Sequence, residues 1–150
     1  MNQQELNTKL AEIKGKVSKI DMSKDSRIYI HCQIEDSYDI NKFLFEEVGA
    51  RFVVATGLDN DNDFEIIYHF SYDQTGCMIN VKAFIPDRKN PSAPSITPFL
   101  PAAEWIEREI HDLLGIKFDG HPNLARLILA DDWPEGVYPL RKDVKKEVKK

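Results

Sequence analysis

The sequence predicts an α+β domain with N-terminal helices, a mostly antiparallel four-stranded sheet, a C-terminal helix and an irregular C-terminal docking segment. Three observations carry this prediction. Apolar residues recur at helical spacing near both ends of the chain, they alternate with polar residues from 27 to 34, and three β-rich runs follow with only short polar turns between them. Such turns join antiparallel neighbours, because a parallel pair needs a longer crossover.

The first expected elements are a helix, a strand and a second helix. Within residues 3–14 the apolar positions keep helical spacing up to a glycine that can end a helix. Residues 27–34 alternate as a half-buried strand does. The second helix begins near Ser37, an acceptable N-cap residue, and stops at Gly49.

The three β-rich runs cover residues 51–58, 64–72 and 77–85. They should form a meander. The following stretch, residues 86–101, contains five prolines, which cannot donate backbone hydrogen bonds to a sheet or helix. We therefore expect it to form an ordered or semi-extended loop.

The last predicted helix spans residues 102–114, between Pro101, which favours a helix start, and Gly115, which favours a helix end. The expected buried stripe consists of apolar side chains: Ala103, Ile106, Ile110, Leu113 and Leu114. The polar side chains fall on two flanks, Glu104, Glu107 and His111 on one and Trp105, Glu109 and Asp112 on the other.

Length and composition indicate one domain. A chain of 150 residues with 42% hydrophobic content can bury one core and leaves too little sequence for a second full domain. We expect residues 1–130 to form that domain. Residues 131–150 have clustered prolines and glycines and few periodic apolar positions, so they should form an irregular partner-docking segment and a basic tail.

The charge distribution excludes a general nucleic-acid-binding surface. The net charge is −5, and the last ten residues carry six basic and two acidic groups, a net +4 that leaves −9 on the rest. An acidic body does not neutralise phosphates. The sequence also lacks a signal peptide and any apolar run near 18 residues, which predicts a cytoplasmic protein without direct membrane insertion.

Motifs for catalysis or cofactor binding are missing from the sequence. Cys32 and Cys77 form no CxxC pair, and neither GxGxxG, GxxxxGK[ST] nor GxSxG occurs. We therefore predict no cofactor and no catalytic residues.

A metal-dependent enzyme is the alternative hypothesis. Glu107 and His111 lie one helical turn apart, and with His121 they could hold a cation. The simpler interpretation is a solvated helix flank with ion pairs from Arg108 to Glu104 and Asp112, each four residues away.

Residues 115–143 are rich in Trp, Tyr, Arg, His and Pro and poor in periodicity. These residue types are enriched among interface anchors, so Trp133, Tyr138 and Arg141 are candidates for a partner contact. The guanidinium of Arg141 can bind a carboxylate through two bonds, in which case its loss should weaken assembly and leave folding unchanged. The alternative is a solvated basic tail and aliphatic side chains that cover the sheet.

Two segments carry a resemblance to a known family. They are residues 91–129, which include "EWIEREIHDLLGIKFDGHPNLARLIL", and residues 131–143, "DDWPEGVYPLRKD". Together they resemble the C-subunit family of NADH:quinone oxidoreductase, respiratory complex I, and its relatives in membrane-bound energy-converting NiFe hydrogenases. Two departures stand out: Ala125 replaces a commonly basic residue, and the "PEGVY" spacer is longer than in quinone enzymes and more similar to the hydrogenase branch.

The resemblance implies a non-catalytic subunit without a cofactor, on the cytoplasmic face of a membrane complex. Its partners would be a hydrogenase-like large subunit and neighbouring iron–sulfur subunits. The matched motif positions, with two aromatic residues of the same segment, give the expected partner-binding residues: Glu107, Arg108, Glu109, Asp112, His121, Arg126, Trp133, Tyr138, Arg141, Lys142 and Asp143.

Overall fold

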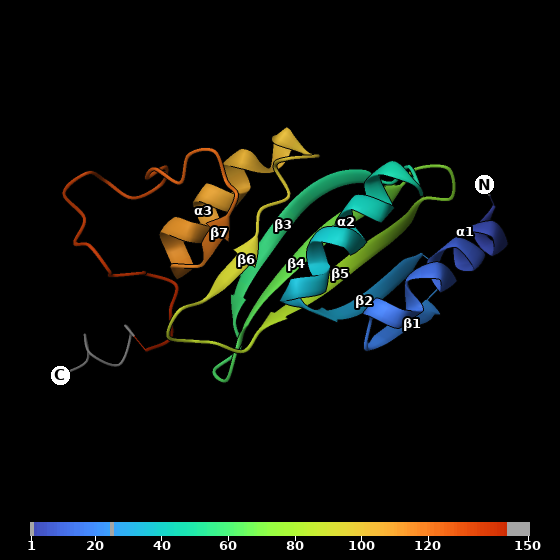
Figure 1. The fold of residues 1–150 in the computed structure, drawn as a ribbon, viewed down its shortest axis with the longest axis horizontal. Helices are drawn as coiled ribbons and strands as arrows, with labels where there is room; N and C mark the ends of the chain where they lie inside the picture. Colours follow the sequence, from blue (N-terminus) through green and yellow to red (C-terminus); the bar gives the residue numbers. More distant parts are fainter. Residues whose placement is uncertain (1, 25, 144–150) are drawn as a thin grey trace. The chain divides into compact units, whose positions relative to one another are not determined.

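The computed structural model describes residues 2–24 and 26–143. Its helices and strands, in chain order, are α1 Gln3–Leu10, β1 Lys19–Lys24, β2 Arg27–Gln33, α2 Ser37–Glu46, β3 Arg51–Asp59, β4 Phe64–Tyr72, β5 Cys77–Ile85, β6 Ser92–Pro94, α3 Glu104–Leu114 and β7 Lys117–Asp119 (Figure 1). Short 3₁₀ helices follow α1 and precede α2 and α3. The α+β class predicted from the sequence is confirmed.

The chain divides into two compact units. Unit 1 comprises the residues up to 56 together with 66–84, and unit 2 comprises 57–65 together with the residues from 85 onward. Strands β3 and β4 begin in one unit and end in the other.

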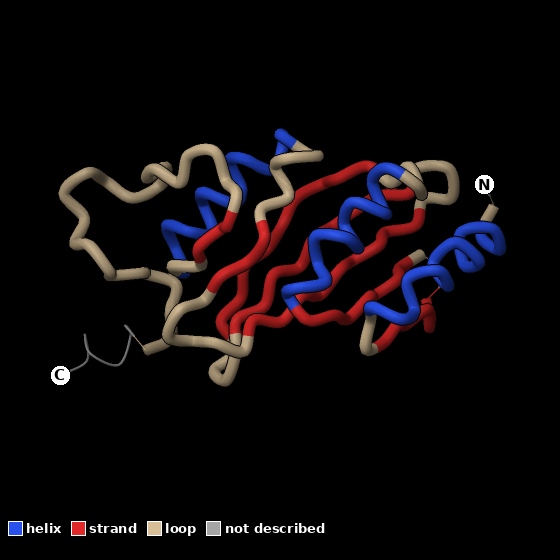
Figure 2. Tube along the Cα trace, in the orientation of Figure 1, coloured by secondary structure: helices blue, strands red, loops and turns tan. Residues whose placement is uncertain are grey.

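The main sheet has five strands in the order β1-β2-β5-β4-β3 (Figure 2). Strands β3, β4 and β5 form the predicted meander, and β4 and β5 coincide with the predicted runs. In the parallel pairing of β2 with β5, Ile30 lies opposite Val81, so the first predicted strand lies inside the sheet between β1 and β5. In unit 1, Ile40 and Leu44 of α2 are completely buried, as their helical spacing predicts.

One strand of this sheet was not predicted. β1 pairs antiparallel with β2, and its burial pattern contains no fully buried residue among Lys19–Lys24. Ile20 and Met22 alternate with polar residues in this strand, but two apolar residues are too few for the pattern to indicate a strand. The predicted helix over residues 3–14 is also divided, because α1 ends at Leu10 and a 3₁₀ helix continues over Ala11–Lys16.

Unit 2 contains α3 and a parallel pair of short strands, β6 and β7, in which Ala93 lies opposite Phe118. The proline-rich stretch is therefore an ordered connection with a three-residue strand inside it. Gly57 of β3 allows α3 to approach closely, because a Cβ at this position would lie 2.7 Å from Cδ1 of Leu114. Gly115 ends α3 in the left-handed conformation, as predicted.

The predicted flanks of α3 are wrong in their exposure. Ala103, Ile110 and Leu114 are buried as expected, but the carboxylates of Glu107 and Asp112 are buried too, with relative exposures of 0% and 4%. Buried carboxylates require hydrogen-bond partners, and both find them in the loops of unit 2.

Candidate functional site

Asp112 fixes a loop through main-chain atoms alone. Its Oδ2 accepts hydrogen bonds from three successive backbone N–H groups, those of Leu127 and Ile128 at 2.8 Å and that of Leu129 at 3.2 Å. Burial opposes ionisation of this carboxyl, yet the three donors hold its pKa below the usual value. The carboxylate thus supplies a hydrogen-bond acceptor to three backbone N–H groups that would otherwise lack one in an irregular loop.

Arg108 holds the preceding part of the same loop. Its Nε donates to the carbonyl of Ala125 at 2.9 Å and its Nη2 to the carbonyl of Arg126 at 2.7 Å. The guanidinium also lies over the indole of Trp105, 5.1 Å from the ring centroid. The expected ion pairs of Arg108 with Glu104 and Asp112 are therefore replaced by bonds to loop carbonyls. We call residues 125–129, held by Arg108 and Asp112, the clamped loop.

Glu107 fixes a second segment on the opposite flank of α3. Its Oε2 accepts from the hydroxyl of Ser95 at 2.6 Å and its Oε1 from the backbone N–H of Ile96 at 2.8 Å. Ser95 in turn contacts the hydroxyl of Thr97 at 2.7 Å. Burial raises the pKa of Glu107 to about 7, although both hydrogen bonds oppose that rise.

The three residues of the alternative metal site do not converge on a cation. His121 Nε2 donates to the carbonyl of Glu104 at 3.0 Å and Nδ1 accepts from the N–H of Asn123 at 2.9 Å, so both ring nitrogens are used. Although His121 Nε2 is 4.0 Å from Glu107 Oε2, His111 bonds instead to the carbonyl of Ile116 through Nδ1. Within residues 2–24 and 26–143, no three His, Cys, Asp or Glu side chains form a group suited to a metal ion.

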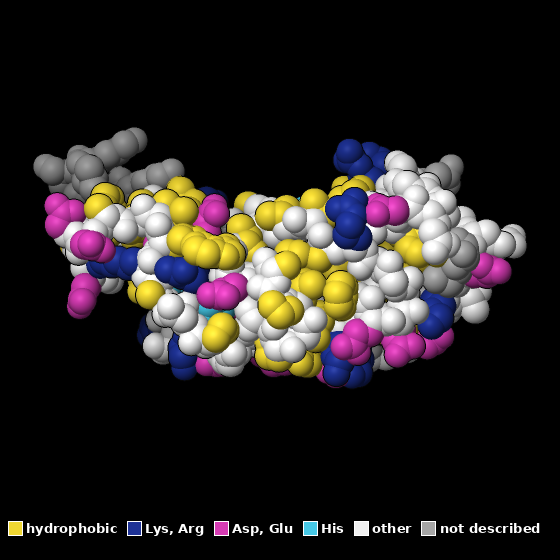
Figure 3. Space-filling model, turned by 90° about the horizontal axis from the view of Figure 1, so that it is seen from above, with side chains coloured by type: hydrophobic (Ala, Val, Ile, Leu, Met, Phe, Trp, Pro, Cys, Tyr) yellow, Lys and Arg dark blue, Asp and Glu magenta, His cyan; other side chains and the backbone are white. Residues whose placement is uncertain are grey.

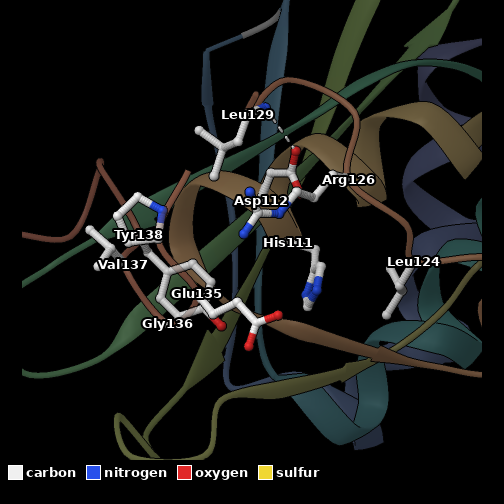
Figure 4. A pocket seen from close by; sticks show the side chains of 10 residues that line it. His111, Asp112, Leu124, Arg126, Leu129, Glu135, Gly136, Val137 and Tyr138 are labelled. Atoms are coloured by element: carbon white, nitrogen blue, oxygen red, sulfur yellow. Dashed lines mark hydrogen bonds between the residues drawn. The ribbon is translucent and has the colours of Figure 1, made fainter. Parts of the chain in front are cut away.

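Side chains of α3, of the clamped loop with Leu124, and of residues 134–138 line an open cavity of about 300 Å³, shown in Figure 4. His111 and Asp112 from α3 form one wall, and Arg126 approaches from the loop. Arg126 also donates to the carbonyl of Ala130 at 2.7 Å, which stabilises the end of the loop. Cationic and anionic side chains both line the cavity, so it has no strong preference for either charge.

The C-terminal segment closes the end of α3. The Nε of Arg141 donates to the carbonyl of Leu114 at 2.7 Å, and its guanidinium lies 5.0 Å and 4.7 Å from the ring centroids of Phe64 and Tyr138. Tyr138 covers Gly115 so closely that a Cβ there would lie 2.4 Å from the phenol ring. A cation near the carbonyl end of a helix is favoured by the helix dipole. Arg141 therefore has an internal role that the sequence did not predict.

Asp59 forms hydrogen bonds to three further parts of unit 2, at Asp61, Arg88 and Lys142. Its carboxylate, whose side chain is 2% exposed, binds the guanidinium of Arg88 at 2.7 and 3.0 Å and the backbone N–H of Lys142 at 3.0 Å. The Arg88 guanidinium, together with N–H groups of Lys142 and Asp61, holds the pKa of Asp59 well below its usual range. Sequence reasoning assigned this acid to a turn, since nothing local connects it to residues more than 80 positions away.

The predicted site residues thus fall into two groups. One group is turned inward and bonds to the chain's own segments: Glu107, Arg108, Asp112, His121, Arg126 and Arg141. The other lies at the surface of unit 2, half-buried or exposed: Glu109, Trp133, Tyr138, Lys142 and Asp143. The predicted basic tail, residues 144–150, lies outside the described residues.

A family profile described as "Respiratory-chain NADH dehydrogenase, 30 Kd subunit" matches residues 30–150. The chain belongs to this family. The match includes α3, the clamped loop and the C-terminal segment, so it confirms the resemblance that those motifs indicated. No helix among the described residues is long and apolar enough to cross a membrane.

Relatives occur in both branches that the resemblance named. The chain is 38% identical over 109 residues to formate hydrogenlyase subunit 5 of Escherichia coli strain K12, covering 70% of this chain and 19% of the relative. It is 33% identical over 123 residues to the NADH-quinone oxidoreductase C-subunit of a Nocardioides species, covering 77% and 48%. With the corresponding protein of Roseiflexus castenholzii it shares 36% over 121 residues, covering 77% and 68%. The chain therefore spans less than half the length of the first two.

Solved structures show the same fold. A chain in the structure of the membrane-bound sulfane sulfur reductase, an archaeal respiratory membrane complex, superposes with a TM-score of 0.79 at 26% identity, over 98% of this chain and 91% of that chain. A fragment of Nqo5 superposes with a TM-score of 0.64 at 24% identity, over 82% and 100%. The Nqo5 likeness concerns the fold alone.

Proposed function

We propose that this chain is a non-catalytic structural subunit of a multisubunit, membrane-associated oxidoreductase, of the energy-converting NiFe hydrogenase or complex I type. Unit 2 would dock onto the hydrogenase-like large subunit, beside neighbouring iron–sulfur subunits, at the cytoplasmic face of the membrane. Relatives named as subunits of hydrogenase-type and NADH-quinone oxidoreductase enzymes support this proposal.

The observation that carries the proposal is where unit 2 exposes apolar surface. The three most exposed large hydrophobic side chains of the described residues are Trp105 at 61%, Ile128 at 54% and Leu140 at 50%, and all belong to unit 2. Figure 3 shows hydrophobic side chains at the surface, interspersed with basic and acidic ones. Exposed Trp surrounded by charged groups is characteristic of interface anchors.

The internal bonds of α3 explain how this surface stays in place. Trp105, Arg108 and Asp112 occupy positions i, i+3 and i+7 and share one side of the helix. Arg108 and Asp112 hold the clamped loop along that side, and Ile128 belongs to this loop. The loop is thereby fixed before a partner arrives, which lowers the entropic cost of association. Glu107 positions the opposite flank in the same way.

Purification of the native protein from gently solubilised membranes tests the proposal. A tagged wild-type chain should co-purify with a hydrogenase-like large subunit and iron–sulfur subunits, identified by mass spectrometry. Replacing both anchors, Trp105→Ser with Ile128→Ser, should release these companions while the circular dichroism of the chain stays unchanged. Val53→Ser, at an exposed position in unit 1, is the matched control and should retain them. Recovery of the wild-type chain alone would refute the proposal.

A further inference from the structure

Unit 2 contains a second, larger cavity that the proposed apolar anchors do not use. Its volume is about 580 Å³. Three elements of unit 2 line it: the turn before β6 with Lys89 and Asn90, the strand β7 with Lys117 and Asp119, and the C-terminal segment with Tyr138 and Arg141. His111 and Gly115, at the end of α3, complete its wall.

The charges around this cavity are predominantly positive. Among the described residues that line it, Lys89, Lys117 and Arg141 stand against one acid, Asp119, whose carboxylate lies 2.9 Å from the amine of Lys117. The carboxylate of Asp87, next to the cavity, is already engaged by two backbone N–H groups at 2.9 and 3.1 Å. The chain as a whole carries −5, so this local excess of cations runs against the overall charge. Such a contrast steers acidic partners to one place on a protein.

Arg141 is pre-positioned in this cavity. Its Nε is bonded to the carbonyl of Leu114, and its guanidinium lies over Tyr138 and Phe64. These contacts fix the plane of the guanidinium, and within residues 2–24 and 26–143 its two terminal amino groups form no hydrogen bond. A guanidinium held in this way loses little side-chain entropy when it binds a carboxylate.

The backbone around the cavity favours carboxylates over phosphate. The end of α3 that lines it is the C-terminal end, where the helix dipole is negative. None of the described residues that line the cavity belongs to a helix N-terminus, whose N–H groups are the usual means of holding a multiply charged phosphate. The three cations stand on separate elements, an arrangement that suits several singly charged groups spaced along a chain.

We propose that this cavity, which we call the cationic socket, binds an acidic segment of the partner subunit, with its carboxylates paired to Lys89, Lys117 and Arg141. The inference rests on the proposed function, because it gives a second contact to the same partner. It differs from the apolar anchors in chemistry: Trp105 and Ile128 contribute buried apolar area, whereas the cationic socket contributes charge selectivity and association rate.

Zero-length cross-linking of the native complex tests the pairing. A water-soluble carbodiimide joins a lysine amine to a carboxylate only where the two are in direct contact. Peptide mapping should find Lys89 and Lys117 joined to aspartate or glutamate of the companion subunit. If companions co-purify but neither lysine is cross-linked to them, the inference is overturned and the proposed function stands. If no companion co-purifies, both fail.

Charge reversal provides the quantitative arm. The double variant Lys89→Glu/Lys117→Glu should weaken reconstitution with the separated partner at least about tenfold at low salt, and the difference should shrink in about 0.5 M salt. Lys14→Glu/Lys24→Glu makes the same change in net charge at exposed positions of unit 1 and should bind as wild type. Equal affinities for the two double variants would refute the inference. So would displacement of the partner by millimolar inorganic phosphate, since the socket would then be a phosphate site.

Discussion

In unit 1, buried apolar side chains alternate along β2 and β5 and line one side of α2, whereas in unit 2 three charged residues of α3 reach out to hold loops. The first kind of order comes from removing apolar area from water and is non-directional. The second comes from hydrogen bonds to charged groups, which are strong and sensitive to geometry. Unit 2 can therefore fix irregular segments that have too few periodic apolar residues to form a core.

The largest expected effect breaks the apolar order of unit 1. Ile30 is completely buried at the centre of β2, so Ile30→Ala should lower the free energy of unfolding by about 3–4 kcal/mol. Urea denaturation should give the same loss at low and high salt, because no charge is involved. Lys42→Ala, on the exposed side of α2, should change stability by less than about 0.5 kcal/mol. A loss that depended strongly on salt would contradict the contrast between the units.

The second prediction breaks the clamped loop. Asp112→Ala removes the acceptor of three backbone N–H groups and should cost about 3 kcal/mol. The loss should be local in character, so hydrogen exchange at residues 127–129 should accelerate far more than at Val81 in β5. Asp132→Ala, at an exposed acid of the following segment, is the control. Unchanged protection of the three loop amides would show that the loop is held by something else.

The third prediction concerns pH. The pKa of Glu107 rises from its ordinary 4.5 to about 7 in the fold, so between these values the folded protein binds more protons than the unfolded chain. The contribution of Glu107 to stability should therefore be fully present below about pH 4.5 and fall by about 3 kcal/mol as pH rises to about 7. His121 Nε2 lies 4.0 Å from Glu107 Oε2. Single variants are therefore needed to assign the pH dependence of stability to Glu107.

Glu107→Gln should remove most of this pH dependence, since an amide keeps donor and acceptor groups but does not ionise. Glu109→Gln, on the same helix, should retain it. Denaturation curves at a series of pH values measure both. Parallel curves for wild type and Glu107→Gln would mean that another group titrates in this range.

The smallest expected effect concerns Arg141. Its bond to Leu114 and its two ring contacts lead us to expect a loss of about 1–2 kcal/mol in Arg141→Ala. This revises the sequence-based expectation that folding would be unaffected. Lys142→Ala removes only an exposed pair with Asp61 and should cost about 0–1 kcal/mol. Equal melting temperatures of wild type and Arg141→Ala would contradict a contribution of Arg141 to folding and leave it only a role in partner binding.

The contrast between the units also explains which predictions from the sequence succeeded. Runs 64–72 and 77–85 match β4 and β5 because alternation and burial are both local properties of a strand. β6 escaped prediction because it pairs with a strand distant in the chain, β7, whereas β1 pairs with the adjacent β2 but contains no fully buried residue. Helical periodicity placed Glu107 and Asp112 on the correct flanks of α3. It could not show that loops cover both flanks, since the N–H donors come from segments 11 to 17 residues away.

In the clamped loop, the path of the backbone and the chemistry of the exposed side chains are determined by different residues. Asp112 and Arg108 contact only main-chain atoms of the loop, and every residue except proline offers the same N–H and carbonyl groups. The exposed side chains of Ala125 and Ile128 can therefore change without altering the path of the backbone. The loop can thus vary in sequence and in the side chains it presents, while Arg108 and Asp112 of α3 keep its backbone in the same place.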